Sequence, residues 1–350
     1  MEKRKSLKTV SLDISEEEYR SLPAYSYSKL SRFRREGFDK LANLDDKLDT
    51  PSLRWGSALD TLLTDGEEEF NKRFIVACFP DIPDSQINVI KTIFKNTEGK
   101  PWKDLKTDDF SFAIDECKFQ PNWRPETRVK VLKENGEQYY NLMVLASGKT
   151  ILTSEEYNDV VTCVDLLKTS DATKWYFQDD DPFDDSIERL YQLKFTGEYD
   201  GIELKAMMDL AVVDHKNKII YPCDLKSSSK SEWNFYKSFV EYNYFIQANL
   251  YSYLLQKTIE KDEYFKDFKI ADYRFIVVCN RTRMPLVWEW PHTKTVLDLT
   301  VGDYKLPNWR GIVKQLDYYL REEPPVPEGI VVEDTNNIVK WLLKESKNEY

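Results

Sequence analysis

The segment 187–228 limits the fold of this chain more than any other part of the sequence. It reads "IERLYQLKFTGEYDGIELKAMMDLAVVDHKNKIIYPCDLKSS", where apolar runs are separated by the turn-like stretches "TGEYDG" and "DHKNK". This pattern is typical of antiparallel strands joined by short turns. Helical patterns precede and follow it, and this order predicts an α/β or α+β fold with a central mixed β-sheet.

Helical patterns divide the rest of the chain. Ser154 is a good N-cap for "EEYNDVVTCVDLLK", and Pro51 with Ser52 opens a helix that ends near Gly66. The sequence predicts five parts. A flexible N-terminal arm at 1–20 precedes a helical part of the main domain at 21–78 and a helical insertion at 79–150. The core of the main domain follows at 151–320, and a linker with a helix at 321–350.

Charged side chains end the last strand of the segment, in "CDLKS". Because side chains alternate between the two faces of a strand, Asp224 and Lys226 point the same way. If the preceding turn holds an even number of residues, Asp209 pairs near Pro222 or Asp224 and shares their face. Two carboxylates and an ammonium group would then meet at one end of the hairpin. The alternative is a strand end whose Asp and Lys are merely solvated, since Asp-x-Lys is a frequent chance pattern.

The order of several residues along the chain resembles that of the PD-(D/E)XK nucleases, specifically the RecB-like and RecE-like (exonuclease VIII) exonucleases. Those families carry Gly-x-x-x-acid on an early helix, Glu before the meander, Asp ending one strand, Asp-x-Lys ending the next, and Gln-x-x-x-Tyr on the following helix. The matching residues are Gly56 and Asp60 in "RWGSALD", Glu188, Asp209 in "MMDL", Asp224 and Lys226 in "CDLKS", and Gln247 and Tyr251 in "QANLY".

The resemblance to the RecE-like branch extends to "LPAYSYSKLSRFR", "LRWGSALDTLL" and "YRFIVVCNRTRMPLVWEW". It covers about 20–75 and 150–320, whereas the insertion at 79–150 has no counterpart. It implies a restriction-endonuclease-like core, in which helices flank a central mixed β-sheet.

The resemblance also implies a metal site for phosphodiester hydrolysis. One or two Mg²⁺ or Mn²⁺ ions would be held by Asp60, Asp209, Asp224 and the main-chain carbonyl of Leu225. The family usually has His at the position of Asp60, and a carboxylate there favours hard cations further.

Four further residues receive catalytic roles from the resemblance. Lys226 would orient the attacking water or neutralise the attacked phosphate, and Glu188 would hold the metal or its water. Gln247 and Tyr251 lie four residues apart, hence on one helix face, where they would hydrogen-bond the carboxylates or a DNA phosphate. Without the resemblance, Gln247 would equally be a polar residue on an aromatic core helix.

Two segments interleave basic and aromatic side chains, "SYSKLSRFRR" and "KSSSKSEWNFYK". Cations pair with phosphates and rings stack on bases, so both segments fit a nucleic-acid strand. A solvated helix face is the alternative. The predicted DNA-binding residues are Arg32, Arg34, Arg35, Ser227, Ser228, Lys230, Trp233 and Lys237.

Composition argues against several other classes of function. The net charge of -11 opposes nonspecific attraction of nucleic acid to the whole surface and leaves room only for a local basic track. Two histidines and five dispersed cysteines favour neither a zinc site nor a multi-histidine site, and no iron–sulfur cluster is expected. No apolar run reaches the roughly 18 residues that span a bilayer. We therefore expect no membrane contact and a cytoplasmic location, in a bacterium or a phage-infected host.

The leading expectation is a Mg²⁺-dependent deoxyribonuclease, an exonuclease acting on duplex ends in DNA recombination, replication or repair. A structure-specific endonuclease is one alternative, because a fold alone does not fix where a strand is cut. A DNA-binding or assembly protein with an impaired site is another, because Asp60 replaces the usual His. The expected partners are double-stranded DNA ends, the single-stranded product, further copies of the chain in a ring-shaped homo-oligomer, and a single-strand annealing protein.

Overall fold

The structure, a computed structural model, describes residues 4–46, 50–178, 185–291, 299–301 and 304–322. The chain divides into two compact units. The first combines Met1–Leu48 with Leu166–Tyr350, and the second is Asp49–Asp165. No helix in the described parts is both long and apolar enough to cross a membrane.

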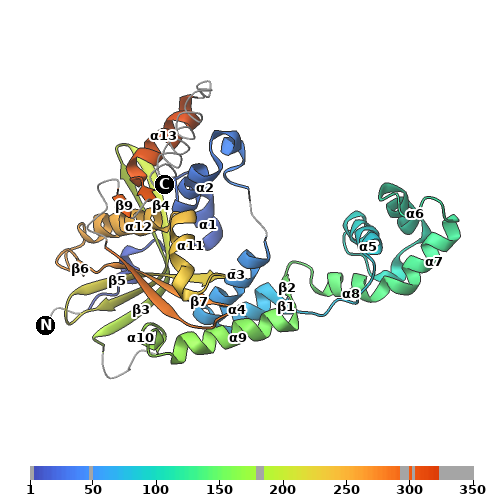
Figure 1. The fold of residues 1–350 in the computed structure, drawn as a ribbon, viewed down its shortest axis with the longest axis horizontal. Helices are drawn as coiled ribbons and strands as arrows, with labels where there is room; N and C mark the ends of the chain where they lie inside the picture. Colours follow the sequence, from blue (N-terminus) through green and yellow to red (C-terminus); the bar gives the residue numbers. More distant parts are fainter. Residues whose placement is uncertain (1–3, 47–49, 179–184, 292–298, 302–303, 323–350) are drawn as a thin grey trace, which may run out of the picture. The chain divides into compact units, whose positions relative to one another are not determined.

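A six-stranded mixed sheet forms the centre of the first unit (Figure 1). Its antiparallel meander consists of β3 (Ile187–Tyr199), β4 (Ile202–Asp214) and β5 (Ile219–Ser228). Parallel to β5 run β6 (Lys269–Ile270) and β7 (Tyr273–Cys279), and β8 (Leu286–Trp290) pairs antiparallel with β7. Asp214 pairs with Ile219, so the β4–β5 turn holds the four residues 215–218, and the condition under which Asp209 shares a face with Asp224 is met.

Helices cover the sheet. Helix α12 (Tyr244–Ile259), which is buried on most sides, packs against β3 and β4, and both α2 (Tyr27–Glu36) and α13 (Trp309–Glu322) pack against α12. The short helices η4 (Glu232–Asn234) and α11 (Phe235–Glu241) lead from β5 into α12. The short helix α10 (Lys174–Phe177) places Trp175 on Tyr221 of β5, whose side chain alternates away from that of Asp224. The predicted α/β class, with helices flanking a central mixed sheet, is confirmed.

Residues 4–20, which are the described part of the flexible arm predicted for 1–20, are folded onto the first unit. A 3₁₀ helix η1 (Leu7–Val10) and helix α1 (Glu16–Ser21) form there, and Ser15 and Glu18 complete a capping box at the start of α1. Leu7 is fully buried in the core of the first unit, and the Leu12 N–H donates to the carbonyl of Lys194 in β3. The sequence analysis overlooked the buried apolar residues Leu7 and Tyr19 because charged residues dominate this stretch.

Small elements complete the first unit. The 3₁₀ helix η2 (Phe38–Asn43) follows α2, and Phe38 packs edge-on against Phe33. Strands β9 (Leu299–Val301) and β10 (Tyr304–Leu306) form a hairpin before α13. The linker and helix predicted for 321–350 lie outside the described residues from 323 onward.

The second unit is mainly helical and has its own core. It contains α3 (Pro51–Thr64), α4 (Gly66–Arg73), α5 (Asp84–Asn96), η3 (Trp102–Asp104), α6 (Thr107–Glu116), α7 (Pro125–Asn135), α8 (Glu137–Leu145) and the parallel pair β1 (Phe74–Val76) and β2 (Thr150–Leu152). Helix α9 (Ser154–Thr169) crosses the boundary between the units. The 79–150 segment is helical as predicted, and α3, which the sequence grouped with the main domain, belongs to the same unit as that segment.

Replacing Leu7 with alanine tests how far the N-terminal segment supports the first unit. The loss of a fully buried leucine should destabilise the protein by about 2–5 kcal/mol. Lys8→Ala, at the exposed neighbouring position, should change the free energy of unfolding little. Chemical denaturation measures both, and equal stability of the two variants would contradict an anchoring role for Leu7.

Candidate active site

The two predicted carboxylates of the meander meet where β5 changes its pairing. Backbone pairing of β4 with β5 extends to Leu210↔Cys223, and from Cys223 onward β5 pairs with β7. Asp209 and Asp224 are the next positions in the β4–β5 register. The Leu225 N–H donates to Asp209 Oδ2 at 3.0 Å, so the carboxylate of Asp209 bridges the two strands just beyond their last backbone pair.

The alternation of β4 slips by one residue at Asp209. Ala206 and Met208 contribute to the same core cluster as Ala211 and Val213, although even and odd positions of a regular strand face opposite sides. On β3, the register places Gln192 opposite Asp209. The φ angle of Gln192 is +54°, in the left-handed region. This local irregularity changes the direction of the side chains at the point where Asp209 leaves the regular strand.

Asp224 is almost completely buried, with 2% of its surface exposed. Its Oδ2 forms an ion pair with Lys226 Nζ at 2.5 Å, and its Oδ1 accepts a hydrogen bond from Gln247 Nε2 of α12. A carboxylate buried without such partners would be strongly destabilising. The ammonium group and the amide therefore allow a negative charge at this position. Gln247 on α12 also fixes the orientation of the Asp224 carboxylate.

Two tyrosine rings enclose Lys226. Its Nζ lies 4.7 Å from the ring centroid of Tyr244 on α12 and 6.0 Å from that of Tyr27 on α2. The Tyr27 hydroxyl donates to the carbonyl of Tyr242 at 2.6 Å, and Ser31 Oγ donates to the same carbonyl at 2.7 Å. These bonds hold α2 against the start of α12, so cation–π contacts from two separate helices restrict the lysine.

The electrostatics show that these groups act on one another. Burial alone would lower the pKa of Lys226, but nearby groups, Asp224 most strongly and Asp209 among them, raise it above the usual value. Burial, and after it Tyr19, Asp224 and Asp209, raises the pKa of Tyr251 well above its usual range. At neutral pH the lysine is therefore charged and the Tyr251 phenol protonated. We call Asp209, Asp224, Lys226 and Gln247 the acidic cluster.

The carboxylate and amide oxygens of the acidic cluster are of the type that a small divalent cation prefers. Apart from the ion pair with Lys226, Asp224 Oδ2 is a buried acceptor without a hydrogen bond from the described residues, and so is Gln247 Oε1. Mg²⁺ commonly takes one or two protein carboxylates and completes its shell with waters and phosphate oxygens. Within the described residues, no three His, Cys, Asp or Glu side chains form a ready-made metal cage.

Glu188 is not brought to the acidic cluster. It pairs with Val213 on β4, four residues from Asp209, or about 13 Å at roughly 3.3 Å per residue. Its carboxylate instead accepts from the Leu7 N–H at 3.3 Å and lies 3.2 Å from His215 Nε2. Its position does not fit the predicted role in holding the metal or its water, because the N-terminal segment and the β4–β5 turn already occupy the carboxylate.

Asp60 lies on α3 in the second unit, so its place beside the acidic cluster stays a prediction.

Tyr251 lies on α12 one turn after Gln247, as the sequence predicted. The main-chain carbonyl of Leu225 lies on β5, between the positions of Asp224 and Lys226. Sequence reasoning missed Tyr244, although Tyr244, Gln247 and Tyr251 follow the i, i+3, i+7 spacing of one helix face.

The predicted DNA-binding residues divide into two groups. Arg32 binds within the first unit, to Glu36 and to the carbonyls of Leu44 and Asp46, and the Ser228 hydroxyl binds both the N–H and the carbonyl of Lys230. These two side chains have structural roles. The exposed members are Arg34, Arg35, Trp233 and Lys237, while Ser227 and Lys230 are half-buried.

Comparison with known proteins adds little to this geometry. No protein-family model and no curated protein matches the chain. Among solved structures, a crystal structure of a "Putative exonuclease" from Eubacterium rectale is similar, with 12% identity, a TM-score of 0.42, and coverage of 89% of this chain and 85% of that chain. At this level the likeness supports no inference about activity, which has to be argued from the site itself.

Replacing Glu188 with glutamine tests its structural role. Burial alone would raise the pKa of Glu188, but hydrogen bonds from His215, Ser6 and Leu7, with the charge of Arg4, lower it. Because the pKa of Glu188 is lowered in the folded state, its carboxylate stabilises the fold at pH values above the ordinary pKa of a glutamate. This stabilisation is lost as the pH falls through the lowered pKa.

Glu188→Gln should therefore lower stability at neutral pH by about 1 kcal/mol. The difference from wild type should shrink under acidic conditions, and thermal unfolding at several pH values measures it. An unchanged melting temperature at neutral pH would contradict the assignment.

Proposed function

We propose that this protein is a metal-dependent deoxyribonuclease that hydrolyses DNA phosphodiester bonds, acting as an exonuclease on duplex ends. The observation that supports the proposal is the acidic cluster, where two carboxylates, a charged lysine and a buried amide converge at the point where β4 and β5 stop pairing. A purely structural ion pair would not need a second carboxylate beside it, nor the buried amide oxygen of Gln247, which accepts no hydrogen bond from the described residues. Perturbed ionisable groups gathered in this way are typical of functional sites.

Each group of the cluster has a role in this chemistry. Mg²⁺ or Mn²⁺, when bound, would supply Lewis acidity toward the phosphate and make water a usable nucleophile near neutral pH. Asp209 and Asp224 would hold the cation, and Gln247 would keep the Asp224 carboxylate in its orientation. Lys226, held charged between its tyrosine rings, would stabilise negative charge that develops on the attacked phosphate.

A DNA-binding or assembly protein with an inactive site is the second candidate. The direct ion pair between Lys226 and Asp224 favours it, because the ammonium group occupies an oxygen that a cation would use. In the active protein, metal binding would have to displace the ammonium toward the substrate phosphate. Cleavage of DNA by the wild-type protein would exclude the inactive-site candidate.

Replacing Asp224 with asparagine is the sharpest test of the proposed chemistry. The substitution preserves size and the hydrogen bond to Gln247 but removes the charge that holds a cation. Asp224→Asn should lose cleavage of linear duplex DNA by at least about 100-fold, as Lys226→Gln should through lost charge stabilisation.

Gel assays with Mg²⁺, and with EDTA as the metal-free control, measure this loss, and circular dichroism confirms folding. Activity of Asp224→Asn equal to wild type would remove the proposal. Intact circular duplex tests the mode of action, because an exonuclease leaves it uncut whereas an endonuclease linearises it.

Gln247→Leu tests whether the amide acts through the metal ligand. Loss of a group that orients a ligand typically costs about 10- to 100-fold in metal affinity or activity. We therefore expect a higher Mg²⁺ requirement, with the rate partly restored by excess metal. Gln256→Leu changes a glutamine on the same helix that binds only Glu260 and should leave the Mg²⁺ requirement unchanged. An identical Mg²⁺ dependence of both variants would exclude this role for Gln247.

A further inference from the structure

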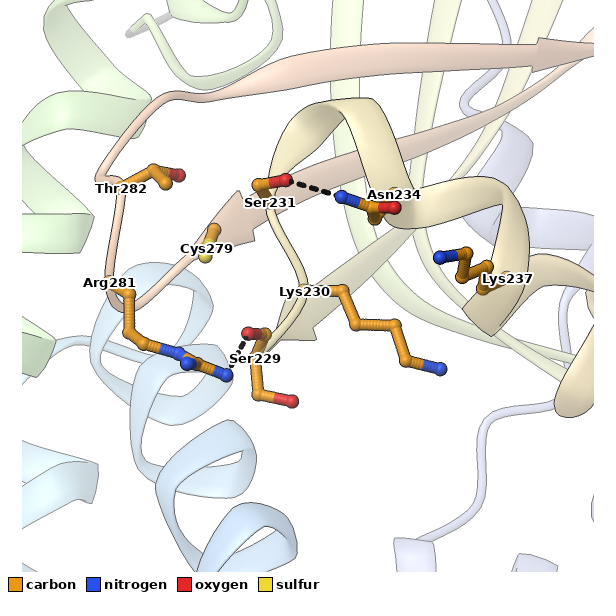
Figure 2. A pocket seen from close by; sticks show the side chains of 8 residues that line it. All are labelled: Ser229, Lys230, Ser231, Asn234, Lys237, Cys279, Arg281 and Thr282. Carbon is orange, nitrogen blue, oxygen red and sulfur yellow. Dashed lines mark hydrogen bonds between the residues drawn. The ribbon is translucent and has the colours of Figure 1, made fainter.

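A pocket of about 420 Å³ opens just beyond the end of β5 (Figure 2). Two separate segments line it. The first follows β5 and contributes Ser229, Lys230 and Lys237, and the second is the β7–β8 loop with Arg281 and Thr282. Ser229 is three residues from Lys226, so the pocket begins within about 10 Å of the acidic cluster along the strand.

Hydrogen bonds fix the two walls of the pocket to each other. Arg281 Nη2 donates to the carbonyl of Ser229 at 2.7 Å, and Thr282 Oγ1 donates to Glu232 Oε2 at 2.9 Å. The hydroxyl of Ser228 also closes the turn at Lys230. The pocket is therefore a built feature of the loops and not a gap between independent side chains.

Positive charge dominates the pocket. Lys230 forms an ion pair with Glu241, and Glu232 binds Thr282, so two carboxylates flank the site. Lys237 and Arg281, however, have no carboxylate partner among the described residues, and Arg281 donates only to a carbonyl. On a chain of net charge -11, two uncompensated cations beside hydroxyl groups provide a local site for an anion.

The segment that lines the pocket also carries an exposed aromatic residue, between the lining residues Ser231 and Asn234. Trp233, on the short helix between Lys230 and Lys237, is 82% exposed. An exposed indole ring is not packed against apolar neighbours, so its flat face is open to stacking by a base. Cations for a phosphate and a free ring for a base, together, are the parts of a site for single-stranded nucleic acid.

We propose that this pocket holds one backbone phosphate of a nucleic-acid strand whose neighbouring base stacks on Trp233. The choice of a nucleic acid over a free phosphate rests on the proposed function and on the exposed ring. The pocket begins within about 10 Å of the acidic cluster, a separation that nearby phosphates of one strand can span. The pocket would therefore hold the strand beside the phosphate that is cut.

Binding of a fluorescently labelled oligodeoxythymidine to the full chain in EDTA tests the pocket without cleavage. Lys237→Ala and Arg281→Ala should each weaken binding, and each should lower the slope of log affinity against log salt by about 0.7, the value of one lost phosphate contact. Trp233→Leu should weaken binding by about tenfold, while Trp233→Phe keeps most of the affinity. Lys216→Ala, an exposed lysine in the turn at the other end of β5, is the matched control.

The outcomes separate this inference from the proposed function. Pocket variants that bind like wild type, in a protein that cleaves DNA, would overturn the inference and leave the nuclease proposal intact. Binding that depends on Lys237, Arg281 and Trp233 in a protein that cleaves no DNA would support the inference and overturn the nuclease. Displacement of the oligonucleotide by an equal concentration of inorganic phosphate, with no effect of Trp233→Leu, would show a free-phosphate site and overturn the inference.

Discussion

The burial of the Asp224 carboxylate is the constraint on which the first unit depends. A charge in this position is tolerated only because an ammonium group and an amide contact its two oxygens. Lys226 comes from the same strand, whereas Gln247 comes from α12, so the helix has to approach the sheet at one particular place. A buried ion pair is weak evidence for stability, whereas perturbed ionisable groups cluster at functional sites.

Parts of the chain that are far apart in sequence converge on this charge. Tyr27 of α2 and Tyr244 of α12 enclose the lysine, and both helices are joined through the carbonyl of Tyr242. Further along β5, the strand continues into the loop that forms the basic pocket. A single strand therefore carries the Asp224 carboxylate, the lysine and the start of the proposed phosphate site, so the proposed binding and the proposed chemistry share one element.

The sequence predicted the sheet well because its signals were local. Alternating apolar runs predicted that Asp209, Asp224 and Lys226 share a face if the turn between the strands holds an even number of residues, and the turn 215–218 holds four. The role predicted for Glu188 was wrong because β3 has 13 residues, so its two ends lie too far apart to belong to one site. The order of residues along the chain does not show which end of the strand lies at the site. Tyr27 and Arg281 carried no local signal, since their roles arise only from contacts across the fold. The slip at Asp209, with Gln192 at positive φ, was equally hidden, because glutamine is not among the residues that favour that conformation.

The central claim is that Asp209 and Asp224 together form a cation site. Crystals soaked in Mn²⁺ test it most directly, because anomalous scattering locates the ion independently of activity. The account predicts an ion about 2.1 Å from at least one oxygen of each carboxylate, with the Lys226 ammonium moved away from Asp224. An acidic cluster that stays metal-free at Mn²⁺ concentrations that occupy other surface sites, with the Lys226–Asp224 ion pair unchanged, would contradict it.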